Sequence, residues 1–122
     1  SQFAINTDGS LALVTTIGET YTAPTALLID KSGKFLFVAN QGSANLAGYS
    51  IGTDGSLALL ASSPFGTGSQ PSYISSDSSG KFLFVGSSSG VQSFQLDTSS
   101  GALTSVGTYS AGSAPTSIVV TQ

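Results

Sequence analysis

The sequence predicts an all-β fold built from repeated four-stranded antiparallel sheets, and three observations lead to this prediction. The heptapeptide SGKFLFV occurs twice, at residues 32–38 and 79–85. The segments TDGSLALV (7–14) and TDGSLALL (53–60) are nearly identical and lie 46 residues apart. Short runs rich in Val, Ile, Leu, Phe, Tyr and Thr alternate with Gly, Ser, Asp and Pro, and no stretch keeps a helical period.

Each repeat of about 46 residues contains four such runs, and this combination is typical of a β-propeller, in which every repeat forms one blade around a central axis. We expect first strands at 25–29, 72–76 and 116–120, second strands at 34–40 and 81–87, third strands at 46–51 and 91–96, and fourth strands at 10–16, 56–62 and 102–108. The segment QFAI near the start is a further third strand.

The whole chain, 1–122, is therefore predicted to be a partial β-propeller. Residues 1–16 hold the third and fourth strands of an incomplete blade, 24–64 and 71–109 are full blades, and 115–122 is the first strand of a further blade. Eleven strands in this order cannot close a ring, and the lack of Met indicates a processed or excised start. We expect either missing sequence or other copies of the chain to complete the propeller. Copies would assemble through strand complementation, with two copies closing six blades or an open head-to-tail join giving a filament.

The second strand of each repeat is apolar on both faces. In KFLFV (34–38), Phe35 and Phe37 point to one side, and Leu36 and Val38 point to the other. A strand of this kind is buried on both sides, as in a blade between two neighbouring blades. The preceding segments DKSGK (30–34) and DSSGK (77–81) are predicted hairpin turns in which Asp caps the turn and Gly takes the left-handed position.

Composition excludes several classes of partner. Three Lys face six acidic residues, and the chain has no Arg and no His, so it cannot neutralise a run of phosphates and is not expected to bind nucleic acid. Its apolar runs are too short to span a bilayer, which argues against membrane insertion. Only 7% of the residues are charged and Cys is absent. This weakly charged, hydroxyl-rich surface favours an extracellular or cell-surface protein, with the cytoplasm as the alternative.

With these segments aligned, the chain resembles the lactonase-type β-propellers, which include bacterial 6-phosphogluconolactonase and the YVTN-repeat surface proteins. The segments FVAN (37–40) and FVGS (84–87) carry the resemblance. It implies a seven-bladed ring, of which this chain holds about 2.7 repeats. The enzymes of this family are associated with His, Arg and Glu at the mouth of the ring. Here His and Arg are absent, and Glu19 is the only Glu.

The loops at the expected ring mouth offer amide and aromatic side chains that are able to hold a sugar through hydrogen bonds and stacking. The candidate ligand-binding residues are Glu19, Tyr21, Asn40, Gln41, Asn45 and Gln70, beside Phe65 and the run SSSG at 87–90. The alternative is that these groups only satisfy the loop backbone. Asp8, Asp30, Asp54, Asp77 and Asp97 are isolated in turns, so we interpret them as turn caps rather than calcium ligands and expect no metal and no cofactor.

These observations favour a non-enzymatic structural or protein-interaction propeller module, because no residue pattern for catalysis is present. Two alternatives remain: a fragment of a lactonase-like hydrolase whose catalytic residues lie outside this chain, and a carbohydrate-binding propeller with a glycan as its partner.

Overall fold

A computed structural model describes residues 1–17, 21–112 and 117–121, and these residues form eleven strands and no helix. The strands β1 (Gln2–Ile5) and β2 (Leu11–Thr15) pair as a hairpin. The first larger sheet contains β3 (Pro24–Ile29), β4 (Phe35–Asn40), β5 (Asn45–Ile51), β6 (Leu57–Leu59) and the short β7 (Phe65–Gly66). The second contains β8 (Pro71–Ser76), β9 (Phe82–Ser87), β10 (Gly90–Leu96) and β11 (Leu103–Tyr109).

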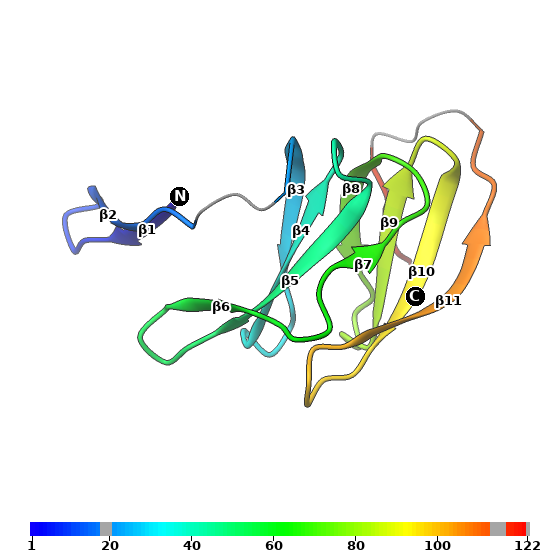
Figure 1. The fold of residues 1–122 in the computed structure, drawn as a ribbon. Helices are drawn as coiled ribbons and strands as arrows, with labels where there is room; N and C mark the ends of the chain where they lie inside the picture. Colours follow the sequence, from blue (N-terminus) through cyan, green and yellow to red (C-terminus); the bar gives the residue numbers. More distant parts are fainter. Residues whose placement is uncertain (18–20, 113–116, 122) are drawn as a thin grey trace.

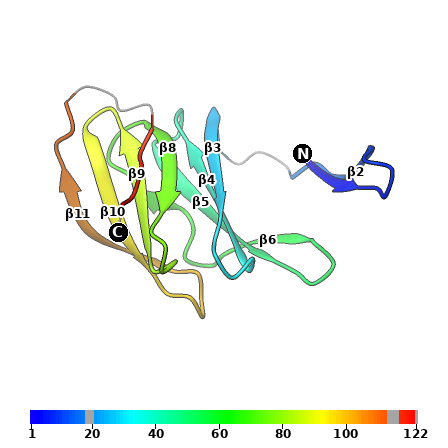
Figure 2. The same cartoon turned by 180° about the vertical axis from the view of Figure 1, so that it is seen from behind.

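Within each larger sheet the strands follow one another in chain order and every pair is antiparallel. The orders are β3-β4-β5-β6, with β7 also paired to β5, and β8-β9-β10-β11. The two sheets lie face to face, and the β1–β2 hairpin projects beyond them (Figures 1 and 2). The side-chain amide of Gln2 in β1 donates a hydrogen bond to the carbonyl of Gly55, which keeps the hairpin in contact with the first sheet. This architecture confirms the predicted fold class of four-stranded antiparallel blades in a partial propeller.

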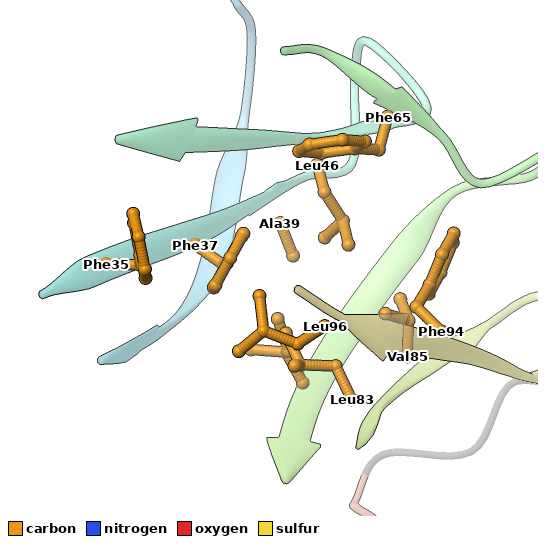
Figure 3. Packing of buried hydrophobic residues seen from close by; sticks show 10 residues of the cluster. Phe35, Phe37, Ala39, Leu46, Phe65, Leu83, Val85, Phe94 and Leu96 are labelled. Atoms are coloured by element: carbon orange, nitrogen blue, oxygen red, sulfur yellow. The ribbon is translucent and has the colours of Figure 1, made fainter. Parts of the chain in front are cut away.

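The hydrophobic core lies between the two larger sheets. The first sheet contributes Phe35, Phe37, Ala39, Leu46 and Phe65, and the second contributes Ile74, Leu83, Val85, Phe94 and Leu96 (Figure 3). The pairing of Ala39 with Leu46 places these two residues on the same face of the first sheet. The ring centroids of Phe37 and Phe65 are 6.5 Å apart at a tilted angle of 56°, a favourable arrangement for two aromatic rings. Phe65 is thus a core residue, which corrects its interpretation as a ligand-binding ring.

Each copy of the repeated second strand is buried on one face only. In β4, Phe35 and Phe37 are buried against the second sheet, whereas Leu36 and Val38 are half-buried on the open side. In β9 the pattern is reversed, because the first sheet covers the Leu83 side and Phe82 is exposed. The prediction that this strand is buried on both faces is therefore wrong for both copies in the described residues, because each sheet packs on the other through one face only.

The fourth strand of the first sheet differs from the prediction. A continuous strand was expected over 56–62, but β6 ends at Leu59 and β7 pairs with β5 further along. The N–H of Leu60 still donates to the carbonyl of Gly48, whereas the N–H of Gly48 donates to the hydroxyl of Ser63 at 3.0 Å. The Ser63 hydroxyl thus takes the place of a backbone carbonyl as the acceptor, and this interrupts the backbone hydrogen bonding along β5.

The end of the chain adds no observed strand. Residues 117–121 belong to no strand of the structure, and the start of the predicted segment lies outside the described residues. That 115–122 forms the first strand of a further blade stays a prediction.

The turns before the two repeated strands confirm the role predicted for Asp. One carboxylate oxygen of Asp30 accepts the N–H groups of Lys34 and Phe35, each at 2.8 Å, and the other accepts the N–H of Ser32 at 3.0 Å. Asp77 makes the same set of bonds to the equivalent residues. Gly33 and Gly80 have φ values of 72° and 74°, the left-handed region that glycine adopts without strain.

Replacement of Gly101 by Ala is expected to be harmful for two reasons, its backbone conformation and its close neighbours. Its φ is 76°, and an added Cβ would lie 2.7 Å from Cδ1 of Phe35 and 2.8 Å from Cδ1 of Leu60, across the gap between the sheets. The Gly101→Ala variant should therefore lose about 1–3 kcal/mol more unfolding free energy than Gly9→Ala, which has a similar φ but open space around it. Urea denaturation of both variants measures the difference. Equal losses would show that Gly101 is needed for its φ alone.

Candidate functional site

The loops that carry the predicted ligand-binding residues gather at one edge of the two sheets. At this edge β3 begins, β4 ends and β5 begins, as the pairing of Asn40 with both Pro24 and Asn45 shows. The hydroxyl of Thr25 donates to the carbonyl of Pro71 at 3.0 Å, so β8 begins beside β3 at the same edge. The edge is the candidate site, and it corresponds to the ring mouth predicted from the sequence.

In the first sheet, the amides of Asn40 and Asn45 are brought together. The side-chain nitrogen of Asn40 donates to Oδ1 of Asn45 at 3.1 Å and to the carbonyl of Val38 at 3.3 Å, and Asn40 is buried. The backbone N–H of Gln41 donates to the carbonyl of Ala23 at 2.8 Å, while its side chain is half-buried. The Asn40 amide is thus already hydrogen-bonded within the chain. This fits the alternative interpretation, in which the polar groups of these loops only satisfy the loop backbone.

In the second sheet, Gln70 lies beside a cluster of hydroxyl groups and is exposed. The backbone carbonyl of Gln70 accepts the N–H of Ser88 at 3.3 Å. The hydroxyl of Ser69 is 2.8 Å from that of Ser87 and 2.7 Å from that of Ser89. The cluster joins the loop before β8 to the loop after β9. The sequence indicated the 87–90 run but not its contact with Ser69, because the contact bridges two separate loops.

A cavity of about 230 Å³ lies against the open face of the first sheet, next to this edge. Two predicted residues, Tyr21 and Asn40, line it together with Leu27, Leu36, Val38 and Tyr49. Burial raises the pKa of the Tyr49 phenol above its usual value, and the neighbouring Tyr21 adds to the shift. Sequence reasoning missed Tyr49 because it lies inside a strand rather than in a loop. Glu19 lies outside the described residues.

Within the described ranges, the acidic groups serve the turns. The carboxylate of Asp97 accepts the hydroxyl and N–H of Ser99, and these hydrogen bonds lower its pKa to about 2. Asp8 and Asp54 have the same arrangement with Ser10 and Ser56, and their pKa values are also lowered. Their role as turn caps is confirmed. A carboxylate whose pKa is lowered in this way is a poor proton acceptor near neutral pH.

Two kinds of feature are not found among the residues that the structure describes. No three His, Cys, Asp or Glu side chains lie close enough together to hold a metal ion. In the same ranges there is no helix with the length and hydropathy needed to span a membrane. In the described part of the chain, the candidate site offers hydroxyls, amides and aromatic rings, which are groups for hydrogen bonding and packing.

Comparison with known proteins gives one family and several similar structures. The model of the family described as "Lactonase, 7-bladed beta-propeller" matches residues 1–64. A protein from Lactobacillus plantarum is 25% identical, with a TM-score of 0.80 over 94% of this chain and 36% of the other. A protein from Bacteroides uniformis, provisionally named a 6-phosphogluconolactonase, is 22% identical, with a TM-score of 0.83 over 98% and 37%.

A third similar structure is the periplasmic gluconolactonase of Pseudomonas aeruginosa, which is 21% identical with a TM-score of 0.77 over 92% of this chain and 34% of the other. The chain thus spans about a third of the length of the solved structures it matches. The search of curated proteins found no match.

Proposed function

Because the chain belongs to the lactonase family of seven-bladed β-propellers, we propose that it acts as a structural and interaction segment of such a propeller and supplies no catalytic group itself. The observation that carries this proposal is the chemistry of the side chains that the sequence and the described residues offer. His and Arg are absent from the sequence, and the aspartates of the described residues accept hydrogen bonds in turns. Lactone hydrolysis needs a base or an activated water, together with donors for the developing oxyanion.

The surface composition supports placing this module outside the cell or at its surface. Charged residues make up 7% of the chain, and Cys is absent. One similar structure is a periplasmic protein, which fits an exported family member.

A second candidate function is that of a segment of a lactonase-like hydrolase whose catalytic residues lie on blades outside this sequence. The similar structure of a gluconolactonase favours it, as does the share of about a third that this chain covers of that protein. In such an enzyme the present blades would shape the ring and leave the chemistry to others. A sugar-binding role has less support, since the Asn40 amide is bonded to Asn45 and Val38.

An activity assay on the purified 122-residue chain tests the proposal. With glucono-1,5-lactone as substrate and acid release followed at constant pH, we expect no rate above spontaneous hydrolysis. The Pseudomonas aeruginosa gluconolactonase serves as the positive control. Hydrolysis by the chain that is lost in Glu19→Gln would overturn the proposal, because it would make the only glutamate a catalytic group.

The same assay on a longer protein that contains this segment separates the two candidate functions. Activity there that survives Glu19→Gln favours the hydrolase segment, and no activity favours the structural module.

A further inference from the structure

The segment TDGS occurs twice, at 7–10 and 53–56, and each copy forms a turn that contains an Asp–Gly pair. The first copy joins β1 to β2, and the second joins β5 to β6. Both strands of each hairpin lie within the described residues, so each turn is complete in this structure. The other three aspartates, Asp30, Asp77 and Asp97, are followed by Lys, Ser and Thr instead of Gly.

The shape of the turn requires the glycine of each pair. Gly9 and Gly55 have φ values of 83° and 82°, a region that residues with a Cβ rarely adopt. The N–H of Gly9 donates to the carbonyl of Asn6 at 3.0 Å, and the N–H of Gly55 donates to the carbonyl of Gly52 at 2.9 Å. The turn therefore places a residue without a side chain directly after the aspartate, and no Cβ shields its backbone nitrogen.

The carboxylate of each pair is exposed and is held by the serine two residues later. Oδ1 of Asp54 accepts the N–H of Ser56 at 3.0 Å and the hydroxyl of Ser56 at 2.6 Å. Oδ1 of Asp8 accepts the same two groups of Ser10, at 2.9 Å and 2.6 Å. These hydrogen bonds favour the ionised carboxylate and fix its orientation toward the serine.

We propose that Asp8 and Asp54 are the sites at which this chain forms isoaspartate, and that Ser10 and Ser56 slow the reaction. In this reaction the backbone nitrogen of the glycine attacks Cγ of the protonated aspartate. The N–Cγ bond forms, the bond from Cγ to its hydroxyl breaks, and the hydroxyl leaves with the amide hydrogen as water, which gives a five-membered imide. Water then opens the imide. Where it breaks the bond from nitrogen to the former backbone carbonyl, the chain continues through Cβ and Cγ as isoaspartate.

Isoaspartate would disturb these turns because it adds one carbon atom to the backbone at their tip. The free carboxylate would then be attached to Cα, which is out of place for the hydrogen bonds to the serine. In the first larger sheet the pairing of Ile51 with Leu57 lies next to the turn, and β6 has only three residues. The modified chain should therefore lose the pairing of β6. The inference does not depend on whether the parent protein is an enzyme.

Prolonged incubation of the folded chain at slightly acidic pH tests the proposal, with trypsin digestion and mass spectrometry by electron-transfer fragmentation as the readout. Cleavage after the lysines places Asp8 and Asp54 on different peptides. Isoaspartate should appear at these two positions and not at the other three aspartates. Ser56→Ala should raise its rate of formation at Asp54 about five-fold, the factor expected for the loss of one hydrogen bond, and leave the rate at Asp8 unchanged.

Ser10→Ala makes the same change in the first turn and should raise the rate at Asp8 alone, so each turn is the control for the other. Ser56→Thr keeps a hydroxyl and should retain the slow rate at Asp54. Absence of isoaspartate from both turns, or an unchanged rate in the Ala variants, would overturn the proposal. A rise at both turns in either variant would do so as well, because it would assign the effect to a general loss of the fold.

Discussion

Replacing Phe37 by Ala is expected to lower the free energy of unfolding by about 3–5 kcal/mol, the range for truncating a fully buried aromatic side chain. Phe37 has no exposed surface and packs on Phe65 and on the second sheet. Domains have about 5–15 kcal/mol of total stability, so this loss is a large fraction of the total. Urea denaturation followed by circular dichroism measures the loss.

The repeat supplies a matched control for this variant. Phe84→Ala makes the same substitution in the same heptapeptide, but Phe84 lies on the open face of the second sheet. The loss for Phe84→Ala should be less than half of that for Phe37→Ala, because Phe84 is half-buried. Equal losses would mean that the packing of the two sheets contributes little to stability.

The sequence predicted the strands well because strand signals are local. Alternation of apolar residues, turn residues and the repeat itself placed second strands at 34–40 and 81–87, and the structure has them at Phe35–Asn40 and Phe82–Ser87. The prediction of a continuous fourth strand in the first sheet failed because the hydroxyl of Ser63, rather than a backbone carbonyl, accepts the N–H of Gly48. Ser is common both in turns and on the faces of strands, so the sequence around Ser63 does not predict this contact.

The candidate site was less predictable, because its contacts cross between segments. The Asn40–Asn45 bond joins two ends of one hairpin loop and follows from the predicted strands. The bond from Ser69 to Ser87 joins two separate loops and cannot be read from a repeat unit. Tyr49 was missed for another reason. Its strand looks like any buried strand, and it lines the cavity together with Gln2 and Ile17, which are distant in the sequence.

The second large effect is expected for Asp30→Ala, which should cost about 3 kcal/mol of unfolding free energy at neutral pH. The carboxylate is buried and accepts the N–H groups of Ser32, Lys34 and Phe35, and its removal leaves the buried N–H of Phe35 without an acceptor. Hydrogen bonds to a charged group contribute about 1.5–3 kcal/mol, and a stranded buried donor adds its own penalty. Asp77→Ala removes the same bonds in the more exposed equivalent turn, so it should cost clearly less.

The pH dependence of this difference tests whether the charge of Asp30 is responsible. Burial alone would raise the pKa of Asp30, but the hydrogen bonds from Ser32, Phe35 and Lys34 outweigh it and hold the pKa below the usual 3.8. A group whose pKa is lowered on folding stabilises the protein fully above its unfolded pKa and loses that effect as the pH falls through its folded pKa. The gap between the unmodified chain and Asp30→Ala should therefore be constant from pH 7 to about 5 and shrink below pH 4. Urea denaturation at each pH measures it, and a gap that persists unchanged at pH 2 would show that the shape of the side chain, rather than its charge, holds the turn.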